Sequence, residues 1–194
     1  MLLEPAPVLG ALAAVVGIAD TLPYARDTLR RATRPHRGTW LIWSVLAVVA
    51  FLAQRADGAS WSAVMCGVQA LMNGAVFALA IRHGSGTLTR GERLLLLFAA
   101  AGVAGWMVAG DPLIATGFVV VADLIAVGMM LPKSWCDPGS ETLSTFAGAS
   151  LSGAFAAGAA GTASLLVYPV YYCLVNGGVA LMLWSRRRVR SDEP

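Results

Sequence analysis

The nine residues 71–79 read LMNGAVFAL, and the nine residues 174–182 read LVNGGVALM. Each copy carries a single asparagine, Asn73 or Asn176, inside a stretch that is otherwise mostly apolar. An apolar stretch of about 20 residues is long enough to cross a bilayer as a helix. We therefore expect both copies to lie within membrane-spanning helices that are related to each other.

The composition of the whole chain agrees with this expectation. Hydrophobic residues make up 57% of the 194 residues and charged residues only 13%, and the mean hydropathy is +0.68. In a typical soluble domain about a quarter of the residues are charged, and such a domain cannot bury this much apolar surface. The composition predicts an all-α integral membrane protein and excludes a disordered chain, a coiled coil and a nucleic-acid-binding protein.

Charged and turn-forming residues divide the chain into seven candidate spans. The first five cover residues 5–23, 38–54, 58–81, 94–110 and 112–132. No charged residue occurs between Glu141 and Arg186, and this stretch is long enough to cross twice with a turn at 161–164. Seven spans fit best, and six spans with one long tilted helix are the alternative.

The basic residues provide an independent test of this count. Loops on the cytoplasmic side of a membrane protein retain lysine and arginine. With seven spans, thirteen of the fourteen basic residues fall on one side, and only Arg55 falls on the other. This predicts a multi-pass protein of the cell membrane with its N-terminus outside and its C-terminus in the cytoplasm.

Three pairs of markers recur in the same order at offsets of 103 to 109 residues. They are the Leu-Pro pairs at 22–23 and 131–132, the threonines Thr39 and Thr145, and the asparagines Asn73 and Asn176. They predict two three-helix units of the same orientation joined by a linker helix, a 3+1+3 parallel repeat. The expected boundaries are 1–83 for the first unit, 84–110 for the linker, 111–185 for the second unit and 186–194 for a basic cytoplasmic tail. Chance similarity between helices rich in alanine, glycine and leucine is the alternative.

With its two Leu-Pro helix ends and its paired asparagines, the chain resembles the PQ-loop proteins, which include the SWEET and SemiSWEET sugar transporters. It is most similar to bacterial members of unassigned function. The resemblance covers essentially the whole chain and implies seven helices arranged as 3+1+3. It also implies that Asn73 and Asn176 face each other across a substrate cavity.

Three polar residues are expected near the middle of the membrane. Asn73, Asn176 and Asp123 each lie nine or ten residues from the cytoplasmic end of their span, or roughly 13 to 15 Å along a helix. No lysine or arginine lies within any predicted span, so Asp123 is either protonated or faces a hydrated cavity. Proton coupling and binding of a cationic substrate are the two functional roles considered, and a bond to a neighbouring backbone carbonyl is the structural alternative. For the asparagines, the alternative is hydrogen bonding between helices.

Two stripes of side chains at four-residue intervals extend from this level toward the outside. They are Met65, Gln69 and Asn73 in the third span and Tyr168, Tyr172 and Asn176 in the seventh. Side chains four residues apart share one face of a helix, so the stripes are expected to line the external half of a pathway. Packing between helices is the alternative. Trp43 is expected to reach the same cavity.

The cytoplasmic side carries the candidate moving parts. Pro23 and Pro132 are proposed as hinges of a cytoplasmic gate, with plain helix ends as the alternative. Asp20 is expected near the cytoplasmic mouth, within reach of an arginine of the following loop. Small residues dominate 147–161, which predicts close approach of the sixth helix to its neighbours.

The leading hypothesis is a carrier that moves a small polar solute, sugar-like or nucleoside-like, by alternating access, with or without proton coupling. The alternative is a receptor or accessory protein of the same fold that does not transport. The spans contain no cluster of histidine, cysteine and acidic residues, so neither an enzyme nor a metal site is expected, and no cofactor is expected either. The expected partners are the lipid bilayer and the solute, with a homo-oligomer left open.

Overall fold

A computed structural model describes residues 4–31, 33, 35–84 and 89–191. Its helices are α1 (Pro5–Leu29), α2 (Arg37–Ala56), α3 (Ser62–His83), α4 (Arg90–Ala109), α5 (Pro112–Cys136), α6 (Leu143–Gly158) and α7 (Ala163–Ser191), with a short 3-10 helix η1 (Pro138–Ser140). All of these helices except α6 and η1 are long and apolar enough to cross a bilayer. The all-helical prediction and the seven helices are confirmed over the described ranges, and six apolar helices of this length are compatible with a multi-pass membrane protein.

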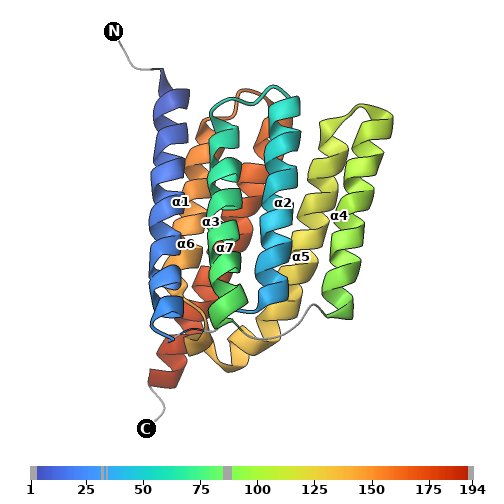
Figure 1. Ribbon diagram of the computed structural model, residues 1–194. Coiled ribbons are helices and arrows are strands. Elements are labelled where there is room, and N and C mark those ends of the chain that lie inside the picture. Colours follow the sequence, from blue (N-terminus) through green and yellow to red (C-terminus); the bar gives the residue numbers. More distant parts are fainter. Residues whose placement is uncertain (1–3, 32, 34, 85–88, 192–194) are drawn as a thin grey trace.

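Successive helices run in opposite directions, so α1 begins at one end of the bundle and α7 finishes at the other (Figure 1). We call these ends the N end and the C end. The connections between α2 and α3, α4 and α5, and α6 and α7 lie at the N end, and the last turns of α1, α3 and α5 lie at the C end.

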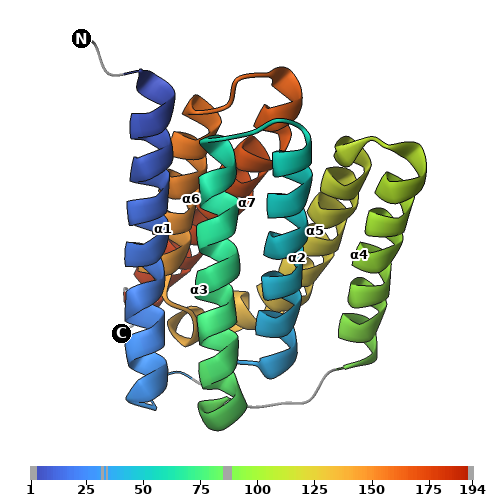
Figure 2. The ribbon, with the colours of Figure 1, turned by 45° about the horizontal axis from the view of Figure 1, so that its top comes forward.

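Six of the helices form a ring, and α4 lies outside it. Helix α3 packs against both α1 and α2, and α7 packs against both α5 and α6. The two triplets are joined where α1 packs on α6 and α2 packs on α5, and α3 also contacts α6. Helix α4 covers the outer side of α5 and α2, as Figure 2 shows. Around the ring, α1 is therefore opposite α5, and α3 is opposite α7.

The predicted close approach of the small-residue helix is confirmed for α6. A Cβ on Gly148 would overlap Asp20 of α1, and a Cβ on Gly153 would overlap the backbone of α7. The Ser152 hydroxyl donates to the carbonyl of Ala13 at 2.8 Å, and the Thr145 hydroxyl donates to the carbonyl of Asp20 at 2.8 Å. Small residues let backbones approach closely enough for such bonds between helices.

Several helix ends differ from the predicted ones. Helix α1 continues through Pro23 to Leu29, and α5 continues through Pro132 to Cys136, so the reading of both prolines as plain helix ends is wrong. A helix that packs against neighbours tolerates the single hydrogen bond that a proline removes. Helix α7 extends to Ser191, so most of the expected basic tail at 186–194 continues the seventh helix.

Candidate functional site

The ring encloses a pocket whose empty space, including its opening, is about 810 Å³. All six ring helices contribute side chains to its wall, and no residue of α4 does. Its polar lining residues are Asp20, Thr21, Tyr24, Gln69, Asn73, Asp123, Glu141, Thr145, Tyr168, Tyr172 and Asn176, together with the indoles of Trp40 and Trp43. The lining extends from the middle of the helices to the start of α6, so the pocket occupies the half of the ring nearer to the C end.

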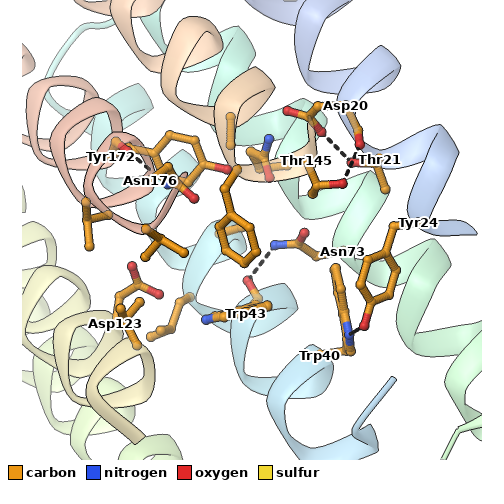
Figure 3. A pocket seen from close by; sticks show the side chains of 18 of the residues that line it. Asp20, Thr21, Tyr24, Trp40, Trp43, Asn73, Asp123, Thr145, Tyr172 and Asn176 are labelled. Carbon is orange, nitrogen blue, oxygen red and sulfur yellow. Dashed lines mark hydrogen bonds between the residues drawn. The ribbon is translucent and has the colours of Figure 1, made fainter. Parts of the chain in front are cut away.

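The two paired asparagines both line this pocket (Figure 3). They come from α3 and α7, which are opposite each other in the ring. The Nδ2 of Asn73 donates to the backbone carbonyl of Trp43 on α2 at 3.3 Å. The Nδ2 of Asn176 donates to the carbonyl of Tyr172 one turn earlier in α7 at 2.9 Å. Asn73 therefore both bridges two helices and presents its amide to the pocket.

Asp123 also lines the pocket, where its carboxylate has a side-chain partner. The phenol of Tyr171 donates to Oδ2 at 2.6 Å, and Trp43 lines the same pocket. The Asp123 carboxylate is therefore bonded to the side chain of Tyr171, and not to a backbone carbonyl as the structural alternative expected. Tyr171 was missed by the sequence reasoning because it lies one residue away from the predicted stripe of α7 and faces α5 instead.

Asp20 lies across the pocket from Asp123, on the opposite helix α1 (Figure 3). It is only 6% exposed, and its Oδ1 accepts a hydrogen bond from the hydroxyl of Thr21 at 2.8 Å. Its Oδ2 is buried and has no hydrogen-bond partner in the part of the chain that the structure describes. The expected pairing with an arginine of the next loop is wrong, because Oδ1 is bonded to Thr21 and Oδ2 is left unpaired at the pocket.

The two predicted stripes do not line an open pathway at the N end. Gln69 and Tyr172 border the pocket, whereas Met65 is 0% exposed and packs in the apolar core. Tyr168 is buried where the pocket ends, with its ring 6.0 Å from that of Tyr172. The stripes therefore form the wall of the pocket that faces the N end, and the rest of the pocket extends from this wall toward the C end.

A polar contact closes the N end above this wall. The Nε2 of Gln54, at the end of α2, donates to the carbonyl of Leu165 at the start of α7 at 3.3 Å. The hydroxyl of Ser62 in α3 donates to the Oε1 of the same glutamine at 3.3 Å. This contact joins the two triplets across the ring. The only sequence signal for it was a glutamine at the last position of the second predicted span.

Aromatic rings form the wall near the C end. The rings of Tyr24 and Trp40 lie 4.8 Å apart, and those of Trp40 and Trp43 lie 5.3 Å apart. The expectation that Trp43 reaches the cavity agrees with this arrangement. Neither Pro23 nor Pro132 lines the pocket, although Pro23 directly precedes the lining residue Tyr24.

Comparisons with protein-family models, with curated proteins and with solved structures found no match. Within the described ranges, no group of three or more histidine, cysteine or acidic side chains is placed to hold a metal ion. What this site can do chemically follows from its geometry: it offers amides, hydroxyls, aromatic faces and carboxylates to a small molecule.

Proposed function

We propose that this protein is a membrane carrier that moves a small polar solute through the pocket by alternating access. The observation that carries the proposal is that one pocket is walled by all six ring helices, occupies the C-end half and is closed toward the N end. Such an arrangement corresponds to one of the two states of a carrier. The other state would open the N end and close the C end.

The packing of the helices supports a 3+1+3 organisation like that of SWEET proteins. In each triplet the third helix packs between the first and the second, and the triplets meet through two equivalent contacts, α1 with α6 and α2 with α5. Rocking of one triplet against the other about these contacts would switch the open end. With the C end placed in the cytoplasm, as the basic residues predict, the pocket lies in the half of the ring nearer to the inside.

Uptake into proteoliposomes tests the proposal. We expect one solute from a broad panel of sugars, nucleosides, amines and amino acids to enter faster than in empty liposomes. Asn73→Ala and Asn176→Ala should each lower this uptake by about tenfold, because each removes an amide that orients the solute. Leu97→Ala on the exposed face of α4 is the control and should leave uptake unchanged.

Measuring both uptake and binding also distinguishes a carrier from a receptor of the same fold. Saturable binding that the asparagine variants abolish, without flux of any solute, would replace the carrier with a receptor of the same architecture. Uptake that the asparagine variants leave unchanged would overturn the assignment of the pocket as the transport site.

A further inference from the structure

We infer that the solute of this pocket is a small organic cation, held through Asp123 and Asp20 and covered by aromatic rings. The inference rests on the proposed function and specifies its substrate class. It departs from the expectation of a neutral sugar or nucleoside, and three observations support it.

The first observation is the charge of the lining. Three acidic residues line the pocket: Asp123 of α5 and Asp20 of α1 reach it from opposite sides of the ring, as Figure 3 shows, and Glu141 lies just before α6. Among the residues that the structure describes, no lysine, arginine or histidine lines the pocket. A carboxylate at membrane depth requires a proton, a counter-charge or water, and a cationic solute provides the counter-charge.

The second observation is a pair of buried polar atoms without a partner. Among the described residues, the Oδ2 of Asp20 and the Nε2 of Gln69 have no hydrogen-bond partner, and the two residues are 6% and 4% exposed. Both side chains border the pocket, and the Gln69 amide lies beside Gly17, one turn of α1 from Asp20. Leaving a buried polar atom unpaired is unfavourable. An ammonium or guanidinium group donates to the carboxylate, and a hydroxyl or carbonyl on the same solute accepts from the amide.

The third observation is the aromatic lining around the carboxylates. The phenol of Tyr171 donates to the Oδ2 of Asp123 at 2.6 Å, which fixes the orientation of this carboxylate at the pocket wall. Trp43, Tyr172 and Phe146 line the same space. Aromatic faces attract cations, most strongly where water is excluded. A sugar would satisfy the amides but would leave both carboxylates without a counter-charge.

Calorimetric titration of the full chain in phosphatidylcholine nanodiscs tests this inference with three probes that share one phenol ring. Tyramine carries an ammonium group, 2-(4-hydroxyphenyl)ethanol carries a neutral hydroxyl in its place, and 4-hydroxyphenylacetate carries a carboxylate. Agmatine and choline extend the cation set to aliphatic probes. We expect at least one cation to bind saturably, and tyramine to bind at least about tenfold more tightly than its neutral and anionic analogues.

Isosteric variants locate the interaction. Asp123→Asn and Asp20→Asn should each weaken cation binding by about tenfold or more, because each removes a partly desolvated charge and keeps the shape of the side chain. Asp111→Asn is the matched control. Asp111 lies exposed in the turn between α4 and α5, and its carboxylate only caps Leu113, so this variant should keep the affinity of the parent.

Three results would overturn the inference: no cation binds, the alcohol or the acid binds as tightly as tyramine, or both pocket variants keep full affinity for the cation. The first two are measured on the unsubstituted chain and do not depend on any variant folding. Uptake of a neutral solute that depends on Asn73 and Asn176, without cation binding, would keep the carrier and reject the cation. Cation binding without flux would keep the cation and reject the carrier.

Discussion

The same six helices form a sealed N end and a hollow C end, and the two ends differ in the size and polarity of their side chains. Toward the N end the ring is filled by Met65 and Cys66, both 0% exposed, together with small residues such as Ala59 and Ala63. Toward the C end the space is bordered by large rings and carboxylates that leave a pocket between them. A tightly packed end excludes water, whereas the rings and carboxylates toward the C end border a space that no side chain fills.

The difference indicates how the sealed end opens. Among the described polar bonds that join the triplets in the N-end half, Gln54 of α2 bonds to α7 and Ser152 of α6 bonds to the carbonyl of Ala13 in α1. Apolar contacts between helices in a bilayer are not favoured by a hydrophobic driving force, since lipid tails are equally apolar. A few bonds and close packing therefore set the stability of the seal, and the following predictions test both.

The largest expected effect comes from a methyl group placed in the sealed end. A Cβ on Gly10 of α1 would lie 2.8 Å from the carbonyl oxygen of Trp61, at the start of α3. Gly10→Ala should lower the free energy of unfolding by about 1–3 kcal/mol, because the two backbones must separate. Thermal unfolding followed by circular dichroism of the purified protein measures the change.

Gly74→Ala in α3 provides the matched control, since a Cβ there meets nothing within 4 Å. This variant should keep or raise the unfolding temperature, because alanine favours a helix by about 1 kcal/mol over glycine. Equal unfolding temperatures for the two variants would contradict the tight packing of the N end.

How far the sequence predicted this arrangement depends on the kind of feature. Hydropathy and charge predicted the seven helices. The positions of Asn73, Asn176 and Asp123 along their helices predicted that the three residues lie at one level, and all three line the same pocket. Rotation of a helix about its own axis is set by packing, so the contact of Tyr171 with Asp123 was not predictable from α7 alone. The link from Gln54 to α7 was missed for a related reason, since it depends on which helices are opposite in the ring.

Loss of the polar contact at the sealed end should have an intermediate effect. Gln54→Leu leaves the Ser62 hydroxyl and the Leu165 carbonyl without their partner, which should destabilise the closed N end by about 1–2 kcal/mol. The opened state should then be populated about five- to thirtyfold more often. The rate at which a polar maleimide labels the fully buried Cys66 reports this population.

The labelling experiment uses a parent chain with Cys136→Ser and Cys173→Ala, so that Cys66 is its single thiol. Ser60→Ala, an exposed position in the same turn as the seal, serves as the control and should label at the parental rate. A Gln54→Leu rate no higher than that of Ser60→Ala would show that the glutamine does not hold the N end closed.

The smallest effect is expected from the loss of a similar hydrogen bond at the hollow end. The indole N–H of Trp40 donates to the phenol oxygen of Tyr24 at 3.3 Å, and both residues border the pocket. Tyr24→Phe removes this bond and keeps the ring contact. Water in the pocket can take over the indole N–H, so the unfolding free energy should fall by only about 0.5 kcal/mol or less. Thermal unfolding of Tyr24→Phe beside Gln54→Leu measures the contrast between the ends. If Tyr24→Phe lowers the unfolding free energy as much as Gln54→Leu does, water does not replace the lost hydrogen bond and the pocket is dry. A hydrated passage for a polar solute would then be excluded at the C end.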